Sequence, residues 1–366
     1  MREGWEYKTI EKCTSIEYGT RVVQKRDGGT IYPVYGGGGE TFRMDRYNRE
    51  DCLIIARFAM SPRCVRYVAG KFFLNDSGLS VKSKEELEQA YLNYHLLFFN
   101  DVIYHLGKGA AQRNLDVKAF RQLVIAIPPK PTQLSIVSEL DKLNELIRIK
   151  KEQLKDYDTL AQSIFYGMFG DPVENERGWE VKKLKDISRK IGDGLHGTPE
   201  YSELDTGWYF INGNNLENGC ISIKSTTKKV TDSVRKEYYI EMDDFTLLVS
   251  INGTLGKSAF YNGENVILGK SACYIKLNKD VNKLFIYEII RGEYFKRYAE
   301  SVCTGTTIRN VSLKAMREFP IIYPPLPLQH SFAQKIEQIE QQKAAIQKTI
   351  TDLETLLAAR IQYWFD

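Results

Sequence analysis

A duplicated block of sequence constrains this chain more than any other feature. Residues 109–133 (GAAQRNLDVKAFRQLVIAIPPKPTQ) align without a gap to 305–329 (GTTIRNVSLKAMREFPIIYPPLPLQ), and eleven of the 25 positions are identical. The segment GWEYK near the start of the chain recurs as GWEVK at 178–182. Internal repetition at a long, fixed spacing indicates one structural unit used twice. We therefore predict two copies of one unit, spanning about 4–170 and 178–366.

Each copy ends in a long run with apolar residues at heptad spacing. Leu140 and Ile147 lie seven residues apart in the first run, as do Ile339 and Ile346 in the second. This spacing is typical of a coiled-coil seam. At roughly 1.5 Å per residue, a helix of about 37 residues, the approximate length of each run, is about 55 Å long. We expect each run to be a rod-like spacer.

The segments that precede the two runs are rich in predicted strands separated by Gly and Asn-Gly turns. The predicted strands are a hairpin at 30–42 and runs at 52–59, 64–74, 209–223, 245–261 and 265–277. Helical periodicity appears at 82–106 and 284–301. The ends of the two segments align, whereas their centres do not. This difference suggests a shared framework that carries two different surfaces.

The net charge of +4 says little by itself, but its distribution is informative. Residues 18–71 hold ten Lys and Arg against five Asp and Glu, and most of the ten are arginines. The guanidinium group suits bidentate contacts with phosphate and guanine. For this stretch taken alone, a solvated basic surface is the alternative interpretation.

Composition excludes several classes of protein. No apolar run reaches the roughly 18 residues that a membrane span needs, and the start MREGWEYKTIEKC lacks the apolar stretch of a signal peptide. The six cysteines are scattered, with no CxxC pair and no nearby histidine. We expect a reduced, cytoplasmic protein without a zinc site.

The order of these motifs, repeated twice, resembles the specificity (S) subunit of type I restriction–modification systems. The matching features are GWE at the start of each copy, the RNxxxKAxRxxxIxxPPxPxQ block, and the long helix after it. YPVYGGGG at 32–39, GDGLHGTPEY at 192–201, FINGNNLENGCI at 210–221 and SINGTLGKSA at 250–259 add to the match. The resemblance covers essentially the whole chain.

The resemblance implies an α+β fold with an internal pseudo-two-fold repeat. Two mixed α/β target recognition domains would be joined by two long antiparallel coiled-coil helices. The implied boundaries are 1–131 for the first recognition domain, 132–169 for the first spacer helix, 170–327 for the second recognition domain and 328–366 for the second spacer helix. Lys150 and Lys343, which interrupt the heptads, would lie at the seam or its edge and fix its register.

The resemblance also implies partners. Each recognition domain would bind one half of a bipartite double-stranded DNA target, and the helices would set the half-site spacing. Two methyltransferase (M) subunits, which methylate adenine with S-adenosylmethionine, and restriction (R) subunits would complete the complex. This chain would be non-catalytic, with no cofactor of its own. The alternative is a coiled-coil scaffold with protein-binding heads, although a scaffold requires neither the arginine-rich stretch nor two different centres.

A DNA-binding surface needs basic side chains for phosphates and polar side chains for base edges. In the first domain the candidates are Arg21, Lys25, Arg26, Tyr35, Arg43, Arg57 and Arg63. In the second domain the candidates are His196, Thr198, Asn212, Asn214, Asn215, Ser250, Asn252, Thr254, Lys257, Lys270, Thr306, Thr307 and Arg309. Each Asn-Gly pair is also compatible with a simple turn. Glycines 36 to 39 fit either a turn or a close approach of the backbone to DNA.

The sequence does not match the catalytic motifs of the enzyme classes considered. The Pro-Pro pairs IPPK and YPPL differ from the Pro-Pro-aromatic motif of DNA adenine methyltransferases, and no GxxxxGK[ST] loop is present. Asp171 with Glu180 and Lys182 is weakly similar to a metal-dependent nuclease site. The same Glu-x-Lys recurs at Glu6 and Lys8 without an upstream Asp, so we assign it to the repeated GWE segment.

Overall fold

The computed structural model divides into two compact units. Unit 1 combines Met1–Glu152 with Ile346–Asp366, and unit 2 is Gln153–Ala345. The division falls inside each of two long helices, α6 (Lys130–Phe169) and α11 (Leu326–Phe365). The residues that the structure describes are 2–109, 112–303 and 309–366. Within those ranges, none of the helices is long and apolar enough to cross a membrane.

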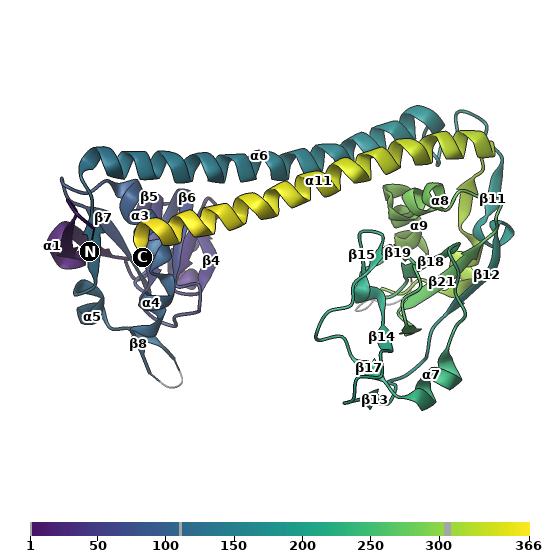
Figure 1. The fold of residues 1–366 in the computed structure, drawn as a ribbon, viewed down its shortest axis with the longest axis horizontal. Coiled ribbons are helices and arrows are strands. Elements are labelled where there is room, and N and C mark those ends of the chain that lie inside the picture. The colour runs from purple at the N-terminus through teal and green to yellow at the C-terminus, as the bar shows by residue number, and fades with distance from the viewer. Residues whose placement is uncertain (1, 110–111, 304–308) are drawn as a thin grey trace. The chain divides into compact units, whose positions relative to one another are not determined.

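Unit 1 is built around a six-stranded sheet with the order β2-β7-β5-β6-β3-β4. Strands β4, β5, β6 and β7 of this sheet are labelled in Figure 1. Adjacent strands in this sheet are antiparallel, except β3 and β6, which are parallel. The strands of unit 1 are β1 (Glu6–Thr9), β2 (Thr14–Tyr18), β3 (Tyr32–Gly36), β4 (Gly39–Met44), β5 (Arg49–Ala56), β6 (Val65–Leu74), β7 (Gly78–Ser83), β8 (Gly107–Lys108), β9 (Asn114–Leu115) and β10 (Val124–Ile127). Its shorter helices are α1 (Ile10–Cys13), α2 (Gln24–Asp27), α3 (Gln89–Phe98), α4 (Asn100–His105) and α5 (Val117–Arg121).

Most predicted elements of unit 1 are present. The hairpin is confirmed by β3 and β4, which pair with Gly36 opposite Gly39. The single helix predicted at 82–106 was wrong at its start, because Lys82 and Ser83 complete β7 by pairing with β2. Helical structure begins seven residues later, and a break then separates α3 from α4. Backbone pairing with β2 holds Lys82 and Ser83 in the strand, despite the helical propensity of the charged run that they begin.

Unit 2 is also mixed α/β, with two four-stranded sheets of order β12-β21-β18-β19 and β13-β17-β14-β20. The strands are β11 (Val181–Lys183), β12 (Ser188–Asp193), β13 (Tyr201–Ser202), β14 (Tyr209–Ile211), β15 (Leu216–Glu217), β16 (Cys220–Ile221), β17 (Lys229–Val230), β18 (Thr246–Ser250), β19 (Ser258–Phe260), β20 (Val266–Leu268), β21 (Ala272–Leu277) and β22 (Pro320–Ile322). The shorter helices are η1 (Leu184–Ile187), η2 (Gly213–Asn215), α7 (Asp232–Tyr238), α8 (Lys283–Arg291), α9 (Glu293–Val302) and α10 (Leu313–Glu318).

The central strands of the two units share one arrangement, although their sequences do not align. β5 pairs with β7 so that Ala56 lies opposite Gly78, and β18 pairs with β21 so that Ser250 lies opposite Ala272. β3 runs parallel to the end of β6, as β14 does to β20. The order β2-β7-β5 of unit 1 therefore corresponds to β12-β21-β18 of unit 2.

The duplicated ends of each copy form the same two-stranded ribbon. β1 pairs antiparallel with β10, and β11 pairs antiparallel with β22, with Tyr7 opposite Ala126 and Val181 opposite Ile322. In both units the GWE segment therefore lies against the strand that leads into a long helix. The repeated sequence at these positions builds this ribbon twice.

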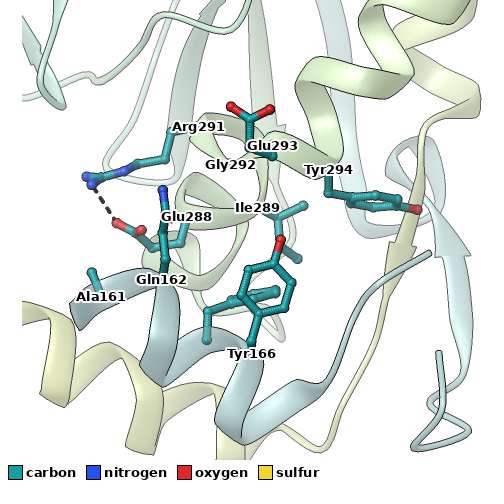
Figure 2. A pocket seen from close by; sticks show the side chains of 10 residues that line it. Ala161, Gln162, Tyr166, Glu288, Ile289, Arg291, Gly292, Glu293 and Tyr294 are labelled. Atoms are coloured by element: carbon teal, nitrogen blue, oxygen red, sulfur yellow. Dashed lines mark ion pairs between the residues drawn. The ribbon is translucent and has the colours of Figure 1, made fainter. Parts of the chain in front are cut away.

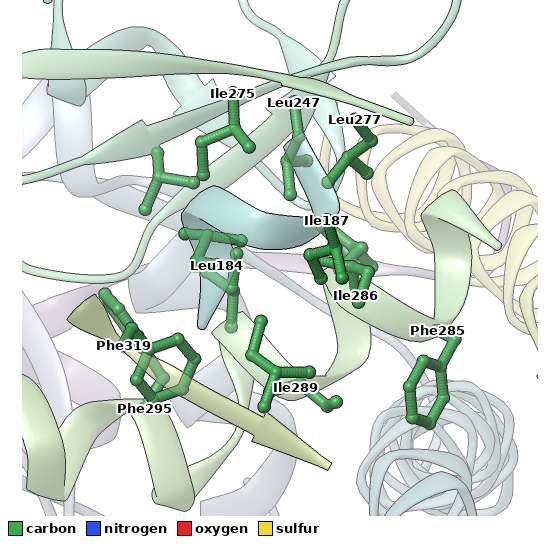
Figure 3. Packing of buried hydrophobic residues seen from close by; sticks show 14 of the residues in the cluster. Leu184, Ile187, Leu247, Ile275, Leu277, Phe285, Ile286, Ile289, Phe295 and Phe319 are labelled. Atoms are coloured by element: carbon green, nitrogen blue, oxygen red, sulfur yellow. The ribbon is translucent and has the colours of Figure 1, made fainter. Parts of the chain in front are cut away.

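The core of unit 2 forms between its β18–β21 sheet and α8. Figure 3 shows Leu184 and Ile187 of η1 between strand residues such as Ile275 and helix residues such as Ile286. All four side chains are at most 2% exposed. Burial of an aliphatic side chain stabilises a fold by about 1.5–3 kcal/mol.

Each long helix starts two residues before the predicted position and accepts a proline in its first turn. Pro131 and Pro327 are the second residues of α6 and α11. N–H groups in a first turn have no partner within the helix, so proline is tolerated there.

Each long helix ends in a phenylalanine that is buried in a unit. Phe365 packs in unit 1 with its ring centroid 5.3 Å from that of Tyr91 and 5.0 Å from that of His95. Phe169 packs in unit 2 with its ring centroid 4.9 Å from that of Phe285 on α8. The last turn of α11 therefore belongs to the core of unit 1, and the last turn of α6 to that of unit 2.

Portions of α6 and α11 lie side by side within each unit. In unit 1, Arg360 forms a bidentate ion pair with Glu139, and Lys151 Nζ lies 2.7 Å from a Glu354 oxygen. Residue numbers rise along α6 as they fall along α11, so these portions run antiparallel. In unit 2, Lys343 Nζ lies 2.9 Å from an Asp158 oxygen.

Candidate nucleic-acid interface

Loops gather at one end of the unit 1 sheet, where β2 and β5 end and β7 begins. Tyr18 pairs there with Leu79, and Ala56 with Gly78. We call this group loop cluster 1, which comprises residues 19–21, 36–39, 57–63, 75–77 and 112–115. Loops held by a rigid sheet are the usual place for binding side chains.

Ser77 holds loop cluster 1 together. Its hydroxyl accepts a hydrogen bond from the Gly37 N–H at 2.9 Å, and its carbonyl accepts one from the Arg57 N–H at 2.8 Å. Gly37 is required at this contact, because a Cβ there would lie 2.0 Å from the carbonyl oxygen of Phe58. Three of the loops are thereby fixed relative to one another.

Unit 2 carries a matching group, loop cluster 2, which comprises residues 194–198, 212–215, 251–257, 269–271 and 309–311. Ser271 repeats the role that Ser77 has in unit 1. Its hydroxyl accepts from the Gly213 N–H at 3.0 Å, and its carbonyl accepts from the Ile251 N–H at 3.0 Å. Two serines in sequences that do not align thus hold the same three loops.

In each unit, the repeated Arg-Asn pair is bonded through its backbone to the loop cluster of that unit. The Met60 N–H donates to the Arg113 carbonyl at 2.9 Å, and the Gly253 N–H donates to the Arg309 carbonyl at 3.0 Å. Two residues later the pattern repeats. The Leu115 N–H donates to the Arg57 carbonyl, and the Val311 N–H donates to the Ile251 carbonyl, each at 2.8 Å. The two clusters therefore share a backbone framework and differ in the side chains that it displays.

Three of the predicted arginines lie in loop cluster 1. Arg21 and Arg63 are exposed. The Arg57 guanidinium lies over two rings, 4.9 Å from the centroid of Tyr18 and 4.5 Å from that of Phe58. Stacking on aromatic faces orients a guanidinium while leaving its edge donors available to a phosphate or a base.

Sequence reasoning missed two further arginines, Arg113 in loop cluster 1 and Arg66 on β6 beside it. Arg66 donates to the Gly37 carbonyl at 2.6 Å, and burial lowers the pKa of its guanidinium. Arg113 lies over the Tyr104 ring at 4.7 Å. Arg113 could have been found, because it is the repeat partner of Arg309, which was predicted. No comparable signal marked Arg66.

The remaining candidates of unit 1 lie apart from loop cluster 1. Lys25 and Arg26 are on α2, beside the far end of β4, where the Gly29 N–H donates to the Arg43 carbonyl at 2.7 Å. Arg26 forms an ion pair with the neighbouring Asp27. Arg43 lies 3.6 Å from a Glu40 oxygen, so two of these three basic side chains have acidic partners.

Tyr35 is only partly exposed. Its ring packs edge-on against Phe72 with centroids 5.5 Å apart. It therefore contributes to packing beneath the cluster.

Five exposed candidates of unit 2 lie along loop cluster 2 from residue 196 to residue 270, and one of the five lies beside a carboxylate. Thr198, Asn214, Thr254 and Lys270 are exposed. His196 is also exposed, and its Nε2 lies 2.7 Å from a carboxylate oxygen of Asp193. Hydroxyl, amide and ammonium groups are the side chains that contact base edges and phosphates.

Three other candidates form hydrogen bonds within the protein, two of them in loop cluster 2 and one at the end of β18. Ser250 is 1% exposed, and its hydroxyl donates to the Thr254 carbonyl at 2.7 Å. Asn212 accepts from the Asn214 N–H at 2.9 Å, and Asn215 donates to the Ser222 carbonyl at 3.0 Å. These side chains shape the loops, as the simple-turn interpretation of the Asn-Gly pairs expected.

The last candidates lie at the edge of loop cluster 2. Asn252 and Lys257 are half-buried. Arg309 is exposed, and its guanidinium lies 2.9 Å from a carboxylate oxygen of Glu300. Thr306 and Thr307 lie outside the described residues.

A small cavity of about 50 Å³ lies in unit 2 between α6 and the junction of α8 and α9. Figure 2 shows Glu288 and Arg291 on its wall beside Gln162. The two charged groups lie 3.4 Å apart, but Glu288 Oε1 accepts no hydrogen bond from the described residues. Burial raises the pKa of Glu288 to about 7. The volume suits a few water molecules rather than a substrate.

The residues that were compared with a nuclease site have structural partners. Lys182 lies over the Tyr323 ring at 3.7 Å and 3.7 Å from a Glu180 oxygen. Asp171 accepts from the Val173 N–H at 2.8 Å in the turn after α6. In the described ranges, no three His, Cys, Asp or Glu side chains gather where they could hold a metal ion.

Comparison with known proteins places this framework in a family. The model of the type I restriction modification DNA specificity domain matches residues 3–156 and 176–355, once in each copy. The type I restriction enzyme MjaVIII specificity subunit of Methanocaldococcus jannaschii is 21% identical over 299 residues, which cover 74% of this chain and 70% of that protein.

Two solved structures share the fold. The type I restriction–modification S subunit from M. genitalium superposes with a TM-score of 0.58 at 17% identity, covering 99% of this chain and 96% of that one. A chain from a structural study of complex assembly and conformational transition of the type I R-M system gives a TM-score of 0.61 at 16% identity, covering 99% and 97%.

Proposed function

This chain belongs to the type I restriction modification DNA specificity family, and we propose how its two copies divide DNA recognition. As a specificity subunit it supplies the sequence selection of a type I restriction–modification complex and is not itself the catalyst. The proposed recognition domains are 1–131 and 170–327. Each binds one half of a bipartite double-stranded DNA target through its loop cluster.

The matched serine bonds carry this proposal. Ser77 and Ser271 hold the same three loops on the same strands in two domains of different sequence. One framework with two sets of displayed side chains is what two recognition events on one DNA molecule require. The arginines of loop cluster 1 suit phosphate and guanine contacts, and the amide and hydroxyl groups of loop cluster 2 suit base edges.

The long helices serve in this proposal as an antiparallel coiled-coil spacer, formed by residues 132–169 and 328–366. The bidentate Glu139–Arg360 pair in unit 1 and the Lys343–Asp158 pair in unit 2 support helix pairing within one chain. The spacer sets the distance between the half-sites. Lys343 acts as the polar residue that fixes the register.

The proposed complex contains two methyltransferase subunits, which dock on the outer faces of the spacer, together with restriction subunits. Exposed apolar side chains on the two long helices support docking, and they include Leu146, Leu160 and Leu356. The solved relative from a study of complex assembly is consistent with such partners. We place the complex in the cytoplasm, where it meets chromosomal DNA.

A scaffold with protein-binding heads is the competing function. It leaves unexplained why arginines gather at one loop cluster, where Arg57 is stacked on two rings.

A salt series on DNA binding tests the proposal. The chain, assembled with the methyltransferase subunits of its own system, should lose affinity linearly on a log–log plot between about 50 and 200 mM salt. Replacing Arg57 and Arg63 with alanine should lower that slope by about 0.9 for each lost phosphate contact. Arg148→Ala, which alters an exposed arginine on α6, is the matched control and should leave the slope unchanged. Binding that is independent of salt would rule the proposal out.

A further inference from the structure

The loops that end in Ser77 and Ser271 differ at their middle position. Each is three residues long and joins matched strands, β6 to β7 and β20 to β21. The first N–H of each loop donates to the end of β3 or β14, at 2.9 and 2.8 Å. The residue between these fixed points is Asp76 in unit 1 and Lys270 in unit 2. One backbone position therefore carries opposite charges in the two units.

Neither charge is neutralised within its unit. Asp76 and Lys270 form no ion pair with any residue in the described part of the chain. Arg57 reaches only the backbone carbonyl of Asp76, at 3.5 Å, and not its carboxylate. Lys270 is exposed and Asp76 is half-buried, so both side chains remain available to a ligand.

The opposite charges decide which part of a DNA ligand this position faces. A carboxylate at a phosphate contact would be repelled by the DNA backbone, so Asp76 is unsuited to that role. A carboxylate at a base edge accepts from the amino group of cytosine, and an ammonium in the same place donates to O6 and N7 of guanine. Because Asp76 and Lys270 occupy the same position in matched loops, Lys270 should also face a base edge and not a phosphate.

We propose that Asp76 and Lys270 are specificity-determining residues that contact base edges in opposite half-sites. Asp76 selects a cytosine in the half-site bound by unit 1. Lys270 selects a guanine in the half-site bound by unit 2. This inference rests on the proposed DNA-recognition function and adds to it the chemical identity of one base in each half.

Methylation mapping on a random-sequence DNA library tests the inference. The full chain with its own methyltransferase subunits is compared with the Asp76→Asn, Asp76→Lys and Lys270→Asp variants. Each variant should lower methylation of the original motif by about 10- to 100-fold through a change at one base pair. The change should fall in one half-site for the Asp76 variants and in the other half-site for Lys270→Asp.

Glu85→Lys and Lys279→Asp are matched controls, because these exposed residues follow the opposite ends of β7 and β21. Both should leave the motif unchanged. Thermal melting and co-purification with the methyltransferase subunits identify any variant that fails to fold, and the isosteric Asp76→Asn then decides for unit 1.

Two outcomes would overturn the inference. One is an unaltered motif, and the other is an equal loss of methylation on all sequences, which marks a phosphate contact. Both leave the proposed function standing if the unaltered chain directs methylation to a bipartite motif. Absence of any bipartite motif for the unaltered chain would instead refute the proposed function itself.

Discussion

Gln133 and Gln329 make the same two hydrogen bonds in the two units. Each side-chain amide donates to the carbonyl of the first proline in its Pro-Pro pair, at 2.8 Å in both units. Each side-chain carbonyl accepts from the backbone N–H just before α3 or α8, at 2.8 and 3.1 Å. The two glutamines are at most 1% exposed. They connect the first turn of each long helix to the helix packed beside it.

Replacing either glutamine with leucine should destabilise its unit. Gln133→Leu and Gln329→Leu each leave a buried donor and a buried acceptor without partners, which costs about 1–3 kcal/mol for each unsatisfied group. Urea unfolding measures the loss. Gln338→Leu, at an exposed position of α11, is the control and should change stability by less than about 0.5 kcal/mol. Equal effects of all three variants would contradict the role given to the buried amides.

A methyl group at Gly37 should disturb loop cluster 1, whereas the same change at Gly38 should not. The Cβ of Gly37→Ala would meet the Phe58 carbonyl oxygen at 2.0 Å, whereas no atom lies within 4 Å of a Cβ at Gly38. We expect Gly37→Ala to weaken DNA binding by tenfold or more and Gly38→Ala to bind normally. Electrophoretic mobility shifts on the mapped target would show whether the two variants differ.

Stability of unit 2 should fall as the pH rises towards 7. Burial raises the pKa of Glu288 from 4.5 to about 7, so the folded state holds its proton more tightly than the unfolded state does. Between these two values the folded state progressively loses up to about 3 kcal/mol of stability. Glu288→Gln should therefore melt at a higher temperature than the parent at pH 8 and at a similar temperature at pH 4.5. Arg291 keeps ion pairs with Asp158 and Glu340 in that variant.

Unit 1 should respond to pH in the opposite direction. Burial lowers the pKa of His95 from 6.5 to about 4, so below pH 6.5 the unfolded state binds a proton that the folded state does not. Stability is therefore lost as the pH falls from 6.5 to about 4, by up to about 3 kcal/mol. His95→Gln keeps an acceptor for the Ala126 N–H and should reduce this dependence. Hydrogen exchange of the α3 amides at several pH values measures this dependence in both proteins. If the stability of His95→Gln varied with pH as much as that of the parent, His95 would not be its cause.

Lengthening both long helices should widen the spacing between half-sites. Seven residues inserted after Glu152 and after Ala345, at the division between the units, add about 10 Å to a helix. This corresponds to roughly three base pairs at about 3.4 Å each. Methylation mapping should then find the same half-sites with a longer gap. A gap of the original length would show that the helices do not set the spacing.

The sequence predicted best what depends on periodicity and repetition. The heptads and the duplicated block located both long helices to within two residues at their starts, because side-chain spacing determines which helix face is buried. The ribbon of β1 and β10 is built again by β11 and β22 from the duplicated ends. Identical residues in two places leave little freedom for different local structures.

The shared centre of the two units could not be predicted in this way. The bonds that match there join backbone groups, such as the Arg57 N–H to the Ser77 carbonyl, and backbone bonds leave no mark on side-chain identity. Burial was equally hidden for Ser250, a polar residue at the end of a strand. Lys25, Arg26 and Arg43 were chosen for charge alone, which does not reveal the end of the sheet to which a loop belongs.

Unit 1 is built from two separate stretches of the chain, and this discontinuity has a consequence for biosynthesis. Unit 2 is one continuous stretch, whereas unit 1 is complete only when Ile346–Asp366 has been added. At roughly 5–20 residues per second, the ribosome needs about 10 to 40 s to make the intervening stretch. Throughout that time the rings of Tyr91 and His95 lack the cover that Phe365 later provides. Unit 1 is therefore started first and completed only after unit 2 has been made, and its apolar surface stays open to chaperones, or to the α11 of another copy, until its own α11 has been synthesised.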